Sequence, residues 1–300
     1  MVNKIQTPPL LKGHGLPNYN EITAKEINQN IPLLLKLLNE QLNNLEDYLE
    51  KKLNRNEILN WDEVMKPLNQ IEEKLRWSWG VVSHMNGVCN SPEFRDAYSD
   101  NQPEIVRFGN KIGQSQIIFE SLLNLQGRQY KNLDQTQLRI IEAELLSMSQ
   151  RGVALKGTEK KLFNDRSEKL AELANQFSNH VIDATNEWSL LLTKSSEVKG
   201  LPPRVLESLA ASAHETGEKT STTDSLPNKD HGPWRIGLDM PSYISVITYS
   251  ENRSLREKLY KAHVSKASFG NLNNTEIIKN ILTLRGEQAK LLGYKHWADL

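Results

Sequence analysis

The chain has 300 residues, which suits one large domain or two ordinary ones, and its 37 basic and 37 acidic side chains give no net charge. This balance excludes a general attraction to nucleic acid or to an anionic membrane, so neither is expected as a partner. The single cysteine, Cys89, cannot form an intramolecular disulfide, and we interpret it as a small buried or half-buried residue in a reducing compartment. Residues 1–16 hold no apolar run of signal-peptide length, and no stretch approaches the roughly 20 apolar residues of a membrane span, so we expect a cytoplasmic protein.

The first part of the chain predicts helices with clear start signals. Residues 1–20 are rich in proline and glycine and predict an irregular lead-in. The segment Thr23–Glu26 has the form of a capping box, and a long leucine-striped helix should follow it. A second capping box, Asn60–Glu63, should begin another helix, which Pro67 should kink or restart.

Further start signals follow. Prolines at Pro92 and Pro103 each predict a helix start, since proline is tolerated in the first turn of a helix. The segment Asp134–Gln137 is a third capping box, and Gly152 and Gly157 should mark the break after the helix that it begins.

The middle of the chain predicts one long helix, a loop and a strand. Apolar residues at helical spacing predict the helix from about Thr158 to Leu192. Polar residues dominate 211–233, which predicts a mobile loop. The alternating segment Trp234–Leu238 predicts a short edge strand that Pro241 ends.

Two more helices are expected after the strand. Ser250 is the predicted N-cap of the first, and the second should start near Asn274 and end before Gly293 at position C′. The second helix should bury five apolar side chains, namely Ile278, Ile281, Leu282, Ala289 and Leu292. The predicted fold class is therefore all-α and multi-helical, with at most a short β element near 234–238.

Four segments of the chain carry, in order, the pattern of a known family. They are Leu16–Ile22, Val82–Arg95, Asn175–Trp188 and Leu238–Tyr294, and the last includes Asn252-Arg253-x-Leu255-Arg256-Glu257 and Leu284-Arg285-x-Glu287. The series resembles the thimet oligopeptidase and oligopeptidase A family of zinc metallopeptidases, and it is most similar to the oligopeptidase A branch. The resemblance implies the N-terminal part of a zincin-like peptidase, whose helical half forms one wall of a peptide-binding channel.

The resemblance also implies a division of the chain. We expect an irregular lead-in at 1–20, an N-terminal helical domain at 21–157 and a long helix with its connection at 158–210. A mobile polar loop should follow at 211–233, and the start of a truncated catalytic region at 234–300.

The residues that carry the family's chemistry are not found in this sequence. The family binds zinc with H-E-x-x-H on a helix and a downstream carboxylate, and the motif's glutamate activates the zinc-bound water. No two of the seven histidines are separated by four positions. His214 begins a partial match, but Glu218 stands at the second histidine position, and Gly217 makes a helix improbable there. His180 and Asp183 could bind a metal, yet we interpret them as a solvated or hydrogen-bonded pair.

We therefore assign no catalytic and no metal-binding residue, and the substrate-binding residues are unknown. Four polar residues near the expected catalytic region are candidates for substrate contact, but Arg253 or Arg256 could equally pair with Glu257 or cap a neighbouring helix. The four are Tyr243, Tyr249, Arg253 and Arg256.

Because family members are longer and the last residues open a helix without completing its stripe, we expect the chain to be the N-terminal portion of an oligopeptidase. The complete enzyme would be a monomer that hydrolyses internal bonds of short peptides, with zinc ligands beyond residue 300 in the missing C-terminal catalytic half. The chain alone should be inactive. The alternative is a catalytically inactive helical module that binds peptides or a partner protein.

Overall fold

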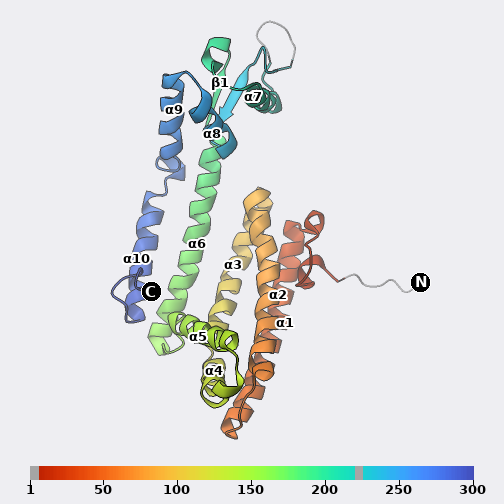
Figure 1. The fold of residues 1–300 in the computed structure, drawn as a ribbon, viewed down its shortest axis with the longest axis vertical. Helices are drawn as coiled ribbons and strands as arrows, with labels where there is room; N and C mark the ends of the chain where they lie inside the picture. Colours follow the sequence, from red (N-terminus) through yellow and green to blue (C-terminus); the bar gives the residue numbers. More distant parts are fainter. Residues whose placement is uncertain (1–6, 220–225) are drawn as a thin grey trace, which may run out of the picture. The chain divides into compact units, whose positions relative to one another are not determined.

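The computed structural model describes residues 7–219 and 226–300. In these ranges the chain is mostly α-helical with one two-stranded sheet, which confirms the predicted fold class (Figure 1). It divides into two compact units, one formed by the chain up to Leu173 together with Ile281–Leu300, the other by Ala174–Asn280. Two helices contribute residues to both units, namely α6 (Gly157–Glu187) and α10 (Thr275–Leu291).

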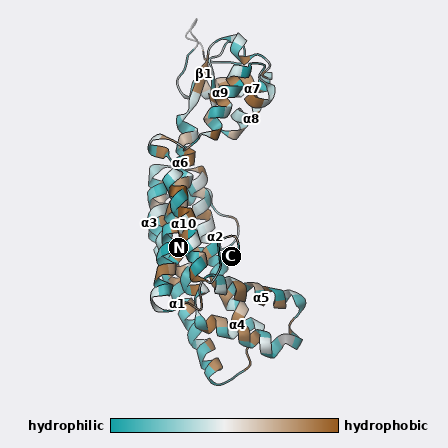
Figure 2. Ribbon diagram, turned by 90° about the vertical axis from the view of Figure 1, so that its left-hand side faces the viewer, coloured by the Kyte–Doolittle hydropathy of each residue, from teal (hydrophilic) through white to brown (hydrophobic). Residues whose placement is uncertain are grey.

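The first unit is built around helix α1 (Ala24–Asn54). Besides its parts of α6 and α10, the unit contains α2 (Trp61–Val88), α3 (Pro92–Gly113), α4 (Gln116–Gln129) and α5 (Gln135–Gln150). Helix α1 contacts α2, α3 and α4, and α5 contacts α3 and α4. Figure 1 shows α1, α2 and α3 side by side. Along these helices hydrophobic and hydrophilic residues alternate in the manner of amphipathic helices (Figure 2).

The predicted leucine stripe of α1 forms the centre of the core. Its fully buried members are Ile27, Ile31, Leu34, Leu38, Leu42 and Leu49. At the N-terminus Thr23 Oγ1 accepts a hydrogen bond from the backbone N–H of Glu26 at 3.1 Å. The Glu26 carboxylate, however, accepts from the Leu10 N–H at 3.3 Å and from Asn30 Nδ2 at 2.7 Å. The predicted capping box is thus only half formed, because Glu26 anchors the lead-in instead.

The other two predicted capping boxes are complete. Asn60 and Glu63 exchange backbone and side-chain hydrogen bonds at the start of α2. Asp134 and Gln137 do the same at the start of α5. Each pair satisfies two N–H groups that have no partner within the helix.

Of the predictions about proline, the helix start at Pro103 is wrong, and the restart at Pro67 does not occur. Helix α3 runs unbroken from Pro92 through Pro103, and α2 continues through Pro67 without a restart. An interior proline removes one backbone hydrogen bond and costs about 3 kcal/mol. The packing of α3 against α1 offsets that cost, since Phe108 and Ile112 lie in the core.

The prediction for Cys89 is also wrong, because its side chain is exposed. It follows the last turn of α2, where the neighbouring Val88 is exposed as well. Val88, the final residue of α2, and Cys89 after it therefore lie outside the core.

The second unit contains the sheet and three further helices. They are β1 (Ser189–Leu192), α7 (Pro203–Glu215), β2 (Trp234–Gly237), α8 (Met240–Tyr249) and α9 (Arg253–Val264). The predicted strand at 234–238 is confirmed, and β1 pairs with it antiparallel, with Leu192 opposite Trp234. The predicted helix to Leu192 is wrong, because α6 ends at Glu187. Pairing with β2 buries Leu192, which a longer helix would not allow.

The loop predicted for 211–233 falls partly outside the described residues, which lack 220–225. Its first residues belong to α7, which reaches Glu215. Helix α7 buries Leu209, Ala210 and Ala213.

Helix α8 was not predicted. Pro241 was interpreted as the end of a strand, yet it lies in the first turn of α8, where Asp239 Oδ1 caps the helix by accepting from the Ser242 N–H at 3.0 Å. The predicted N-cap Ser250 is instead the C-cap of α8. Asn252 caps α9.

Helix α10 begins and ends as predicted, and Ala289 is buried as predicted, but the rest of the buried face differs. Gly293 has φ +84°, and the backbone N–H of the residue after it reaches the Ala289 carbonyl at 2.9 Å, as in a helix C-terminal motif. Ile278 and Leu282 are 45% and 62% exposed, so their predicted burial is wrong. The buried residues are Ile277, Gln288 and Ala289.

The helices of the described ranges include none with the length and apolar character needed to cross a membrane.

The stripe of α1 gives a direct stability test. Leu34→Ala should lower the free energy of unfolding by about 2–5 kcal/mol, because the site is fully buried and the truncation leaves a cavity. Leu33 is 51% exposed on the same turn, so Leu33→Ala is the matched control and should cost less than about 1 kcal/mol. Urea unfolding followed by circular dichroism measures both. Equal losses in the two variants would contradict the assigned core face.

Candidate functional site

Within the part of the chain that the structure describes, no three histidine, cysteine, aspartate or glutamate side chains come together in a group that could hold a metal ion. His214 lies in the last turn of α7, but the helix ends at Glu215, so the segment 214–218 does not form the continuous helix that H-E-x-x-H needs. The apolar face of α7 makes the helix, and Gly217, at φ +81°, ends it. Glu215 is the last residue of α7, and Glu218 follows the helix.

His180 has a structural partner. Its Nδ1 lies 2.9 Å from Oδ1 of the buried Asn274, and Asn274 Nδ2 donates to the Phe177 carbonyl at 3.1 Å. These bonds connect α6 to the residue that precedes α10. The imidazole is therefore used in packing at this position.

The four substrate-contact candidates lie on two adjacent helices of the second unit, Tyr243 and Tyr249 on α8 and Arg253 and Arg256 on α9. Arg256 Nη1 donates to the Ser250 carbonyl at the C-terminus of α8, which is the helix-capping role considered above. Glu257 pairs with Lys261 at 2.7 Å rather than with either arginine.

Tyr243 stacks on His263, with ring centroids 3.9 Å apart and planes inclined by 16°. Burial lowers the pKa of His263, and the nearby Lys266 ammonium lowers it further. Among the described residues, His263 Nδ1 is a buried polar atom with no hydrogen-bond partner. The stack holds a neutral imidazole between α8 and α9 at neutral pH.

An apolar hollow of about 440 Å³ lies in the second unit. Trp188, Leu238 and the exposed Phe269 line it, with Glu187 and Lys266 supplying opposite charges. Such a hollow can hold an apolar side chain of a ligand. Sequence reasoning missed it, although an aromatic residue beside a glycine-asparagine loop is a signal for exposure.

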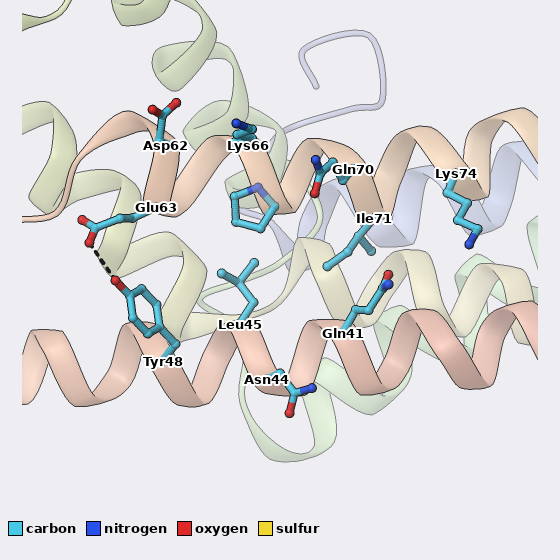
Figure 3. A pocket seen from close by; sticks show the side chains of 11 residues that line it. Gln41, Asn44, Leu45, Tyr48, Asp62, Glu63, Lys66, Gln70, Ile71 and Lys74 are labelled. Carbon is cyan, nitrogen blue, oxygen red and sulfur yellow. Dashed lines mark hydrogen bonds between the residues drawn. The ribbon is translucent and has the colours of Figure 1, made fainter. Parts of the chain in front are cut away.

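A larger groove, of about 620 Å³, separates α1 and α2 in the first unit (Figure 3). Leu45 of α1 and Pro67 and Ile71 of α2 form its apolar surface. The view shows Tyr48 and Glu63 pointing toward each other across the groove.

A hydrogen-bond network closes this end of the groove. Tyr48 Oη donates to Glu63 Oε1 at 2.7 Å, and Lys52 Nζ donates to the same oxygen. Although burial works to raise it, the pKa of Glu63 is lowered by these hydrogen bonds and by the Asn60 backbone N–H. Glu63 therefore stays ionised and holds the two helices together at neutral pH.

The rest of the groove carries polar side chains without partners among the described residues. These are Gln41, Asn44, Lys66, Gln70 and Lys74. Amides and ammonium groups above an apolar floor can bind an extended peptide, because they offer donors to its carbonyls and its carboxylate. Sequence reasoning missed the groove, because polar residues beside a leucine stripe are indistinguishable from a solvated face.

Two family models match the chain in order. Residues 31–160 match the Neurolysin/Thimet oligopeptidase N-terminal domain, and residues 246–300 match Peptidase family M3. The Probable cytosolic oligopeptidase A of Arabidopsis thaliana is 35% identical over 297 residues. In these segments the chain is similar to the N-terminal part of the thimet oligopeptidase and oligopeptidase A family.

Relatives in the family extend well beyond the matched region. The Arabidopsis thaliana match covers 99% of this chain and 40% of the relative. Organellar oligopeptidase A, chloroplastic/mitochondrial, of the same plant is 35% identical, with 99% and 36% covered. Oligopeptidase A of Escherichia coli (strain K12) is 30% identical, with 97% and 41% covered. The chain thus spans about two-fifths of the length of these relatives.

The groove network has a testable pH dependence. Glu63→Ala should lower the free energy of unfolding by about 1–2 kcal/mol, because the Asn60 backbone N–H loses its acceptor in the capping box and the cross-helix hydrogen bonds are lost. Glu63→Gln keeps an oxygen acceptor but not the charge, so its loss should be smaller.

The direction of this pH dependence follows from the lowered pKa of Glu63. The charge-dependent stabilisation is present above the unfolded value of 4.5 and is lost as the pH falls through the lower folded value. The difference between wild type and Glu63→Gln in urea unfolding should therefore be full at neutral pH and shrink below 4.5. A difference that does not change with pH would contradict the network.

Proposed function

We propose that the chain is the N-terminal portion of a zinc-dependent metallo-oligopeptidase that hydrolyses internal bonds of short peptides. The ordered match of two family models, together with relatives that cover almost the whole chain, carries this proposal. The metal site would lie beyond residue 300, in the part of the relatives that this chain does not span.

The residues described here do not fit a zinc ion, since they offer no cluster of three ligands. We therefore assign no step of hydrolysis to any residue of this chain. Its role in the complete enzyme would be to form one wall of the peptide-binding channel and to support the catalytic half.

Exposed apolar pairs support a contact with that missing half. On α9, Tyr260 and Val264 are exposed and one helical turn apart. On α10, Ile278 and Leu282 are exposed at the same spacing. Large apolar side chains repeated on an exposed helix face are typical of an interaction surface. We infer that each face packs against the catalytic portion in a complete, monomeric and cytoplasmic enzyme.

The groove between α1 and α2 favours a second candidate function. A chain with free donors above an apolar floor could act as a module that binds short peptides without cleaving them. Under this alternative the 300-residue chain should bind peptides by itself.

The chain alone should show no zinc-dependent cleavage of a quenched fluorescent peptide, because its described residues include no group of three ligands that could hold the metal that activates water. Fluorescence with added zinc, with and without a chelator, measures this. Robust turnover that the chelator abolishes would overturn the assignment of the metal site.

A chimera tests the positive part of the proposal. This chain would replace the matched 41% of Escherichia coli oligopeptidase A. We expect chelator-sensitive peptide cleavage, because the helical part supports the catalytic part. A folded chimera without activity would argue against the proposal, and peptide binding by the 300-residue chain would then favour the module.

Matched variants test the contact faces in that chimera. Val264→Glu and Leu282→Glu should each reduce cleavage at least about tenfold, since a charge in an apolar interface lacks a partner. Leu146 on α5 is similarly exposed, so Leu146→Glu is the control and should leave cleavage unchanged. Loss in the control alone would contradict the assigned faces.

A further inference from the structure

A separate cavity of about 470 Å³ lies in the first unit, where α2, α3 and α5 come together. Leu75, Ile105 and Ile112 give it apolar walls, and Trp79 adds an aromatic face. Trp79 stacks on Tyr98, with centroids 4.8 Å apart and planes inclined by 26°. The stacking contact with Tyr98 therefore helps to hold the Trp79 ring in its place in the cavity wall.

Two glycines in the interior of long helices face this cavity. Gly80 lies in α2 and Gly109 in α3, and a Cβ added at either would meet no atom within 4 Å. Glycine is among the poorest helix formers, and here it is not needed for close packing of a neighbour. What these two glycines do provide is open space beside Trp79.

Four charged side chains line the cavity without pairing directly. Glu72 and Glu144 supply carboxylates, and Arg76 and Arg151 supply guanidinium groups. Among the residues that the structure describes, Glu72 has no hydrogen bond or ion pair, and the Arg151 guanidinium reaches only the Gly109 carbonyl, at 3.4 Å.

The Glu72 carboxylate is electrostatically unsatisfied. Burial raises the pKa of Glu72, and Glu144 raises it further, while Arg151 and Arg76 act in the opposite direction. A half-buried carboxylate without a hydrogen bond is unfavourable unless a donor reaches it. A ligand with a positively charged donor would supply that partner.

We propose that this cavity binds a small zwitterion with an apolar side chain, either a free amino acid or a short peptide. Its ammonium would lie at Glu72 and Glu144, its carboxylate at Arg76 and Arg151, and its side chain against Trp79. The mixture of charges selects this class of ligand. A phosphate ligand would meet two carboxylates, and a purely apolar ligand would leave all four charges without partners.

The proposal does not depend on the peptidase assignment. The cavity lies within the first unit, and its residues differ from those of the groove between α1 and α2. It is a ligand site on the helical scaffold that needs no metal.

The first test is isothermal titration of the 300-residue chain at neutral pH with L-leucine and with L-leucyl-L-leucine. We expect saturable binding of at least one, and the stronger one identifies the length of the ligand. N-acetyl-L-leucine lacks the ammonium and L-leucinamide lacks the carboxylate, so each should bind at least about tenfold more weakly than leucine. No saturable binding of either zwitterion, or equal binding of the blocked compounds, would overturn the proposal.

Three glycine variants test whether the ligand binds in this cavity. Gly109→Leu fills the space and should abolish binding, whereas Gly127→Leu changes a similarly open helix glycine outside the cavity and should not. Gly80→Leu repeats the test from α2. Circular dichroism confirms that each variant is folded, and equal affinity in the filled and control variants would place the ligand elsewhere.

The half-buried Glu72 carboxylate also predicts a pH dependence. Because the folded pKa of Glu72 is raised, the stability linked to it is present below the unfolded value of 4.5 and is lost as the pH rises. Glu144, Arg76 and Arg151 are the charged groups that face it. Glu72→Gln should therefore raise the melting temperature at neutral pH, with the gain shrinking as the pH falls toward 4.5 and absent below it, and should weaken leucine binding at least about tenfold. A gain in stability with unchanged binding would overturn the assigned ammonium contact.

Discussion

The burial of one apolar stripe on α1 is the constraint on which the first unit depends. Leu34, Leu38 and Leu42 are fully buried, and α2, α3 and α4 all contact the helix that carries them. A helix packed on several sides fixes the positions of its neighbours, because close-packed side chains leave few alternative arrangements. The groove and the cavity of this unit are therefore set by where α2 and α3 can pack on α1.

The two hollows of the first unit differ in their charge. In the groove, Glu63 is satisfied by Tyr48 and Lys52, and the remaining donors are open to a ligand. In the cavity, Glu72 has no such partner, and carboxylates and guanidinium groups stand together without direct bonds. Similar residue types thus connect α1 and α2 in the groove, whereas in the cavity they are available to bind a ligand. Hydrogen bonding, rather than composition, makes the difference.

Within the described ranges, the histidine, cysteine, aspartate and glutamate side chains form no group of three that could hold a metal ion. His180 and His263 are used in packing, the first against Asn274 and the second against Tyr243. Similarity to the family nevertheless extends over two segments, one before and one after the small sheet in the sequence. Fold and chemistry are separable in this way because function resides in sites that a fold supports rather than in the fold itself.

The sequence by itself determined the features that depend on neighbouring residues. The capping boxes at Asn60 and Asp134, the C-terminal motif at Gly293 and the stripe of α1 all arise from local hydrogen bonds or helical spacing. The family resemblance is likewise a property of the sequence alone, because ordered motifs along the chain carry it.

Only the tertiary structure decided the rest. Strand β1 forms because β2 offers it a hydrogen-bonding edge, and α3 continues through Pro103 because its face is buried on α1. Ile278 and Leu282 are exposed because burial depends on which neighbours a helix meets. The groove and the cavity could not be predicted from the sequence for the same reason. Their residues come from different helices, and only packing between distant segments brings them together.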